Sequence, residues 1–311
     1  TGAGSDPLTM ISETAPQNYV ARRITSRDGL SLYVRDYDHV AGDHVAGDHV
    51  GGGKRVVLCL GGLTRNSKDF GDLAERLSDR HRIICVDYRG RGLSDYDPNW
   101  TNYTPPTYVD DIRQIIAALN IHEIAVVGTS LGGLLAMGLG AAAPGALKGV
   151  LLNDVCPDLP VDMLASIVAY AGATPELEDW DAAKRYLRDN APVSSAVLED
   201  HIDDMVRNTF TKRSDGKIVF GWDTNIIKPL SDRRAAEMDL WPLFSSLKNI
   251  PLLSIRGGLS PFVTDQALQR MATVASNLSS VTVPGAGHAP TLTEDICHDA
   301  IDEWLSRCFE L

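Results

Sequence analysis

Hydrophobic residues along this chain gather in short continuous runs, and helical patterns lie between the runs. The runs indicate strands at 30–37, 56–60, 82–87, 124–127, 150–152, 252–255 and 281–283. Continuous apolar runs are typical of strands that are covered on both faces. Amphipathic spacing over 66–78, 107–119 and 295–309 predicts helices. This alternation predicts an α/β protein with a mostly parallel sheet flanked by helices.

The alternation stops between residues 155 and 249. Helical patterns at 162–171, 181–190 and 196–210 take its place, and little strand signal remains there. An all-helical insertion between two strands of one sheet should lie as a lid over one edge of that sheet. We therefore predict an α/β core of residues 1–156 and 241–311 and a helical cap of residues 157–240.

Composition and charge exclude some classes of partner. The chain has 311 residues and a formal net charge of −12. A negative field of this size repels phosphate groups, so we expect neither nucleic acid nor a membrane surface as a partner. The five cysteines show no CxxC spacing, which is typical of reduced core thiols. With no signal peptide or spanning segment visible, we expect a cytoplasmic protein. Its oligomeric state stays open.

A short repeat at 38–42 recurs at 43–47 and nearly again at 48–52. Its histidines and aspartates could form a metal tract, or the repeat could be a duplicated flexible loop. We favour the loop, because a metal site needs fixed geometry and the segment has no core-forming residues. We expect no metal and no cofactor.

The pattern G-x-S-x-G occurs at Gly128, Ser130 and Gly132. It lies between the strand pattern at 124–127 and a helical pattern at 132–143, so the turn must be tight and the serine exposed. The helix start also places the Leu131 N–H beside the reacting carbon. We predict that Ser130 is a nucleophile. A serine hydroxyl needs a base, and His288, in a glycine-rich loop after the last strand pattern, is the best candidate.

Three further segments extend this pattern. Gly61, Gly62 and Leu63 follow the strand pattern at 56–60, residues 87–94 read D-x-R-G-x-G-x-S, and residues 285–290 surround His288. Together with the serine motif they resemble the α/β-hydrolase family, and they are most similar to small ester or lactone hydrolases of the 3-oxoadipate enol-lactonase type. The resemblance implies an eight-stranded sheet and an oxyanion hole made by the Leu63 and Leu131 amides, with Gly62 letting the backbone approach. Arg89 and Arg91 could steer an anionic substrate or anchor a turn, and we favour anchoring.

The acid of the triad departs from the family pattern. The family usually places its aspartate where this chain has Pro261, and proline cannot orient an imidazole. We favour Asp154, which follows the strand pattern at 150–152, because some relatives carry their acid after this strand. Asp265 is the rival, with helix capping as its other interpretation. Asp158 and an incomplete triad also stay open.

The predicted cap is rich in aromatic residues. We expect Tyr170, Trp180, Phe220 and Trp222 to line an apolar pocket over Ser130, although each could instead pack inside the cap. The sequence thus predicts hydrolysis of a small ester or lactone, apolar or aromatic in part. Cleavage of a C–C bond in a ring-fission dienoate, a cofactor-free perhydrolase and a non-catalytic ligand-binding protein are the alternatives.

Overall fold

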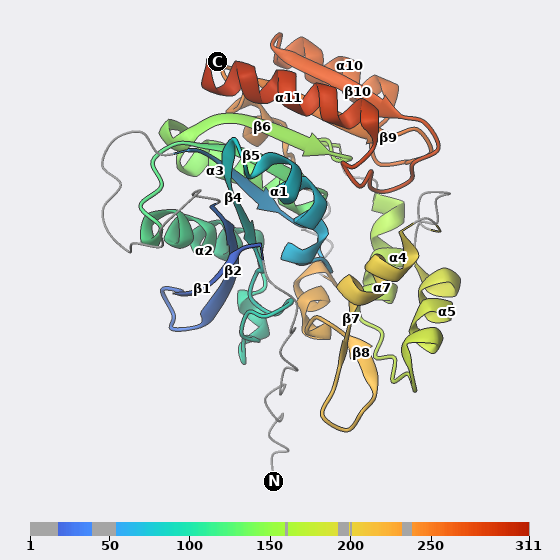
Figure 1. Ribbon diagram of the computed structural model, residues 1–311. Coiled ribbons are helices and arrows are strands. Elements are labelled where there is room, and N and C mark those ends of the chain that lie inside the picture. Colours follow the sequence, from blue (N-terminus) through green and yellow to red (C-terminus); the bar gives the residue numbers. More distant parts are fainter. Residues whose placement is uncertain are drawn as a thin grey trace.

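An eight-stranded sheet forms the centre of the protein. The computed structural model describes residues 18–38, 54–158, 161–191, 199, 201–231 and 238–310. The strands follow the order β1-β2-β4-β3-β5-β6-β9-β10 (Figure 1). They are β1 Val20–Thr25, β2 Ser31–Tyr37, β3 Arg55–Leu60, β4 His81–Val86, β5 Ile124–Thr129, β6 Leu147–Asn153, β9 Leu252–Gly257 and β10 Leu278–Val283. Strand β2 is antiparallel to β1 and β4, and the other neighbouring pairs are parallel, so the predicted mostly parallel sheet is confirmed.

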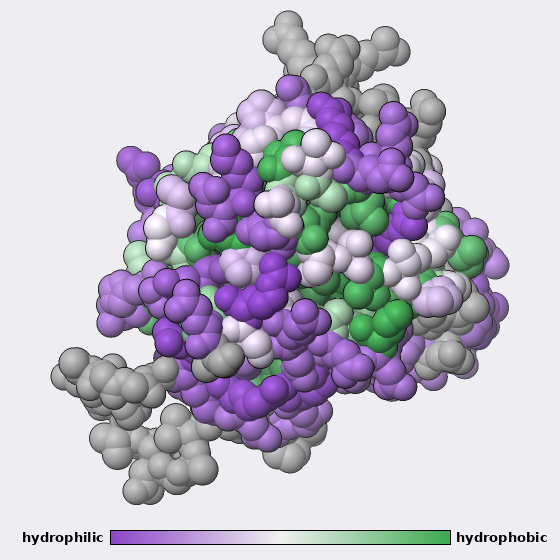
Figure 2. Space-filling view, turned by 90° about the horizontal axis from the view of Figure 1, so that it is seen from above, coloured by the Kyte–Doolittle hydropathy of each residue, from purple (hydrophilic) through white to green (hydrophobic). Residues whose placement is uncertain are grey.

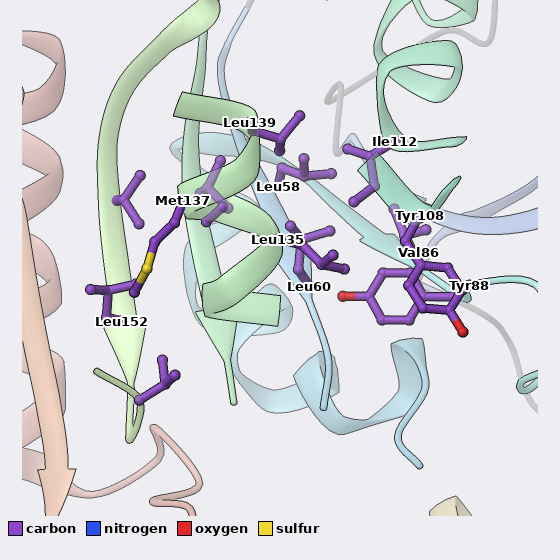
Figure 3. Close-up of a cluster of buried hydrophobic side chains, with 14 of the residues drawn as sticks. Leu58, Leu60, Val86, Tyr88, Tyr108, Ile112, Leu135, Met137, Leu139 and Leu152 are labelled. Atoms are coloured by element: carbon purple, nitrogen blue, oxygen red, sulfur yellow. The ribbon is translucent and has the colours of Figure 1, made fainter. Parts of the chain in front are cut away.

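Helices cover both faces of this sheet. The helices outside the segment between β6 and β9 are η1 Ser67–Phe70, α1 Gly71–Leu77, η2 Trp100–Asn102, α2 Pro105–Ala118, α3 Leu131–Ala142, η3 Pro144–Ala146, α10 Asp265–Val274 and α11 Asp295–Phe309. Side chains of β3 alternate between the two layers. Val57 and Cys59 join a cluster with α1 and α11, whereas Leu58 and Leu60 join a cluster with α2 and α3 (Figure 3). This double burial explains the continuous apolar runs.

The sequence predicted an all-helical segment between β6 and β9. This prediction is wrong, because the segment also contains a strand hairpin. It contains α4 Val161–Ala171, α5 Trp180–Asn190, α7 Ile202–Thr209, η4 Thr224–Ser231, α9 Trp241–Ser245 and a hairpin of β7 Phe210–Lys212 and β8 Ile218–Phe220. Phe210, Ile218 and Phe220 are buried, and Gly216 has a φ of 91° in the turn. The sequence signals this hairpin by the pair Asp215-Gly216, with alternating apolar positions around it. The prediction of helices overlooked this signal.

The surface is hydrophilic at the edges of the face in Figure 2, and hydrophobic residues gather near its middle. Within the described part of the chain, every helix is too short or too polar to cross a bilayer.

All five cysteines are buried free thiols, as predicted. The 38–52 repeat lies outside the described residues except for Asp38.

Candidate active site

Ser130 lies at the turn between β5 and α3, with φ 51° and ψ −114°. A Cβ on Gly128 would lie 2.6 Å from backbone atoms of Gly132 and Gly133, and one on Gly132 would lie 2.0 Å from the Leu60 carbonyl oxygen. Only glycine fits these two positions. The Ser130 amide donates to the Asn153 carbonyl oxygen at 3.0 Å, which ties the turn to the end of β6. The chain therefore holds this serine in a strained turn, as the motif predicts.

The imidazole of His288 lies beside this hydroxyl. Its Nε2 is 3.0 Å from Ser130 Oγ. The ring of Phe262 stacks on the imidazole with 3.8 Å between ring centroids, and the His288 side chain is 15% exposed. Stacking and burial together fix the plane of the imidazole so that Nε2 faces the serine.

Asp154 lies at the other nitrogen of this ring. Its Oδ2 is 2.6 Å from His288 Nδ1, and the carboxyl group is fully buried. The Gly257 amide donates to Oδ1 at 3.0 Å, and the Ser260 hydroxyl donates to Oδ2 at 2.5 Å. A carboxylate only accepts, so this contact favours the proton on Nδ1 and leaves Nε2 to accept from Ser130.

The other candidate carboxylates lie away from His288. Asp265 begins α10 and forms an ion pair with Arg256 at 2.5 Å. Asp158 accepts from the Trp241 indole at 2.7 Å. The loop after β9, which contains Pro261, supplies Ser260 to Asp154 in place of an acid. The structure thus brings Asp154, Ser130 and His288 together and leaves the two rivals elsewhere.

The loop of Gly61, Gly62 and Leu63 passes close to Ser130. A Cβ on Gly62 would lie 3.8 Å from Ser130 Cβ, and Leu63 lines the same cavity as Ser130. Leu131 is the first residue of α3, where an amide has no intrahelical acceptor. Within the described part of the chain, neither the Leu63 nor the Leu131 amide has a hydrogen-bond acceptor. Both amides are therefore available to an oxyanion on a carbon bound to Ser130.

A cavity of about 410 Å³ opens over Ser130 and His288. Tyr170 lines it together with Ile167, Leu187 and Met205, all from the segment between β6 and β9. Burial raises the pKa of Tyr170 to about 12, so its phenol stays protonated at neutral pH. The cavity therefore offers an apolar wall that carries one neutral hydroxyl group.

Three of the four predicted aromatic wall residues do not line this cavity. Trp180 is the first residue of α5 and is 38% exposed. Phe220 and Trp222 are buried and stack on each other with 3.9 Å between centroids. They lie behind Tyr170, whose ring is 5.3 Å from that of Phe220. Phe220 and Trp222 pack in the interior because burial alternates along β8 and the two residues that follow it.

Sequence reasoning missed several residues of the site. Asn153 is buried beside Asp154 and donates to the Pro290 carbonyl oxygen at 2.9 Å, which ties β6 to the histidine loop. Phe262 stacks on His288, and Ser260 holds Asp154. These residues carry no motif of their own, although Asn153 could have been suspected as the neighbour of the favoured acid.

Polar and charged side chains line the other part of the cavity. They include Arg65, Lys68, Asp69, His201 and Asp204. Arg65 binds both carboxylate oxygens of Asp69 at 2.6 and 2.7 Å and donates to Thr209 at 2.7 Å. Among the described residues, no group of three or more His, Cys, Asp or Glu side chains is placed to hold a metal ion.

Comparisons with known proteins identify relatives of this chain. Residues 56–300 match the model of the alpha/beta hydrolase family. A 3-hydroxybutyrate-oligomer hydrolase of Cupriavidus necator is 31% identical over 77% of this chain and 84% of its own length. A 2-(acetamidomethylene)succinate hydrolase of Mesorhizobium japonicum is 28% identical over 90% of this chain and 93% of its own length.

Solved structures add a match of the fold. A crystal structure of an alpha/beta hydrolase from Novosphingobium aromaticivorans superimposes with a TM-score of 0.83 and 36% sequence identity, covering 94% of this chain and all of the other. The family match leaves out β1 and β2, but it covers the sheet from Val56 of β3 to the end of β10 and every residue of the Ser130 site. This chain therefore belongs to the alpha/beta hydrolase family.

Proposed function

We propose that this protein hydrolyses a carboxylic ester or lactone through an acyl-enzyme on Ser130. The observation that carries the proposal is the continuous set of contacts from Ser130 Oγ to His288 Nε2 at 3.0 Å and from His288 Nδ1 to Asp154 at 2.6 Å. The buried carboxyl group of Asp154 supplies the acid that Pro261 cannot supply. Pro261 stands where the family usually has its aspartate, but Asp154 can take over that role. Pro261 therefore does not favour a protein that lacks catalytic activity.

The proposed reaction has two halves. Ser130 Oγ attacks the carbonyl carbon while His288 Nε2 takes the hydroxyl proton, and the Leu63 and Leu131 amides hold the oxyanion. The C–O bond to the leaving group then breaks, and Nε2 gives its proton to the alkoxide. Water repeats the sequence on the acyl-enzyme, releasing the acid and restoring Ser130. The nucleophile, the base, the acid and the oxyanion donors of this proposed cycle are side chains and amides of the protein, and water comes from the solvent.

Hydrolysis of esters should be separable from cleavage of C–C bonds, which related folds perform with the same three residues. We expect turnover of p-nitrophenyl esters or lactones with chains of two to about eight carbons, since the cavity of about 410 Å³ holds a small substrate. The measurement is kcat/KM across a panel of such esters, lactones and a ring-fission dienoate. Turnover of the dienoate alone would replace the ester proposal with C–C hydrolysis.

We also propose that residues 157–240 form a cap over the site, with Tyr170 as a wall for the substrate. Replacing Tyr170 by alanine should raise KM by about tenfold, because an aromatic contact surface worth about 1.5 kcal/mol is lost. Trp180→Ala is the matched control, since this aromatic residue of the same segment is exposed, and KM should change less than about twofold. Equal effects of the two variants in steady-state kinetics would contradict the assignment of the wall.

The proposed substrate is a small, partly apolar ester or lactone. The relatives named above are hydrolases of 3-hydroxybutyrate oligomers and of 2-(acetamidomethylene)succinate, so members of this family differ in substrate. We further propose a reducing compartment such as the cytoplasm, which the five buried free thiols support.

A further inference from the structure

The loop that carries Leu63 is held at three consecutive carbonyl groups. The Tyr88 hydroxyl donates to the Gly61 oxygen at 3.1 Å, the Arg65 amide donates to the Gly62 oxygen at 3.2 Å, and Arg91 Nε donates to the Leu63 oxygen at 2.7 Å. In a trans peptide, N–H and C=O point in opposite directions. Holding the Gly62 oxygen therefore directs the Leu63 N–H the opposite way, and the contact with Arg91 fixes the peptide that follows.

Arg91 is an unusual donor for this purpose, because it is fully buried and yet pairs with no acidic side chain among the described residues. Its Nη1 donates to the Arg89 carbonyl oxygen at 2.9 Å and to the Tyr108 hydroxyl at 2.8 Å, and the guanidinium lies 4.8 Å from the centroid of the Tyr108 ring. Within the described part of the chain, no carboxylate lies within 4.0 Å of Arg91, and its Nη2 is buried without a hydrogen-bond partner. Figure 3 shows Tyr88 and Tyr108 side by side in this region.

The neighbouring arginine shows the usual solution for a buried cation. Arg89 lies two residues away and pairs with Asp28, Asp97 and Asp111 at 2.6 to 2.7 Å. Its role is to anchor the turn, as the sequence analysis favoured. A buried charge without such a partner costs stability, and the faces of aromatic rings offset only part of that cost. The positive charge of Arg91 therefore lies behind the residue whose amide would face the oxyanion, and among the described residues no carboxylate forms a direct ion pair with it.

We propose that Arg91 is a positioning residue of the oxyanion site. Its Nε contact fixes the Leu63–Thr64 peptide, which directly follows the peptide that carries the Leu63 N–H, and its charge favours the negative oxygen that forms when Ser130 attacks a carbonyl. The inference rests on the proposed serine hydrolase function. It gives Arg91 a role in stabilising the transition state and no role in binding the uncharged substrate, because Arg91 lies behind the loop.

A trifluoromethyl ketone provides a direct test. Ser130 Oγ adds to the ketone carbon, the hydroxyl proton passes to His288, and the ketone oxygen becomes the oxyanion. Arg91→Met should raise the inhibition constant of the ketone and lower kcat, each by about 10- to 100-fold, as for partial loss of an oxyanion donor. KM for an ester should change less than about threefold. Arg91→Lys keeps the charge and loses the planar contact, so its loss should be smaller.

Tyr108→Phe is the matched control, since it removes a polar contact on the side of the guanidinium away from Leu63, and it should change the inhibition constant less than about threefold. Melting temperature separates function from folding, because a buried unpaired charge can be replaced by an apolar side chain at little cost. If Arg91→Met does not fold, Arg91→Lys and Tyr88→Phe, which frees the Gly61 oxygen, carry the test.

Two results would overturn the inference: an unchanged inhibition constant in folded Arg91 variants, or a rise in KM as large as the loss of ketone affinity. A separate experiment on the parent protein tests the proposed hydrolase function itself. A fluorophosphonate that does not label Ser130 would remove both proposals, whereas labelled parent protein with unaffected Arg91 variants would remove this inference alone.

Discussion

Replacing Ser130 by alanine should lower kcat for an ester by about five orders of magnitude and abolish labelling by a fluorophosphonate. The reason is geometric. Ser130 Oγ lies 3.0 Å from His288 Nε2 at the floor of the cavity, and alanine leaves no atom that can form the acyl-enzyme. The residual rate should come from the oxyanion amides and substrate binding alone. Single-turnover kinetics and mass spectrometry of the labelled protein are the measurements.

Ser246→Ala serves as the control, because Ser246 is exposed and its hydroxyl donates to the Leu243 carbonyl oxygen of its own helix. This variant should label and turn over like the parent. The Ser130 variant should keep its melting temperature, since the turn is held by Gly128 and Gly132 and not by the serine hydroxyl. Persistent labelling of Ser130→Ala would assign the nucleophile to another residue and refute the mechanism.

Replacing Asp154 by asparagine should lower kcat by about 10⁴-fold with little change in KM. An amide presents a donor to His288 Nδ1 and favours the tautomer that carries its proton on Nε2, where it can no longer accept from Ser130. The backbone should tolerate the change, because Asp154 has a φ of 54° and asparagine is one of the few residues that adopt this conformation readily. Steady-state kinetics with a measured melting temperature tests the prediction.

Asp265→Asn is the matched control. Asp265 was the rival acid from the sequence, and its side chain is 80% exposed and paired with Arg256. Loss of this exposed pair should change kcat less than about twofold, since such pairs contribute little. A large loss in the Asp265 variant and none in the Asp154 variant would show that the acid had been misassigned.

The sequence by itself determined the fold class and the positions where Ser130 and His288 would lie. Continuous apolar runs follow from strands covered on both faces, and the spacing of Gly128 and Gly132 follows from backbone contacts that no side chain fits. These are local or periodic constraints, so they are written directly in the order of residues. The hairpin of β7 and β8 was also encoded locally, by the Asp-Gly turn, and was overlooked.

The tertiary structure decided which carboxylate meets His288 and which aromatic residues face the cavity. Asp154 and Asp265 both follow plausible patterns, yet only the parallel pairing of β6 with β9, and β9 with β10, carries Asp154 to the histidine loop. Tyr170 and Trp222 come from the same segment, yet only Tyr170 lines the cavity. Likewise, nothing in the spacing of Arg89 and Arg91 reveals that Arg89 pairs with three acids, whereas Arg91 pairs with none of the acids that the structure describes. Such contacts join residues far apart in the chain, and their distances depend on how whole elements pack.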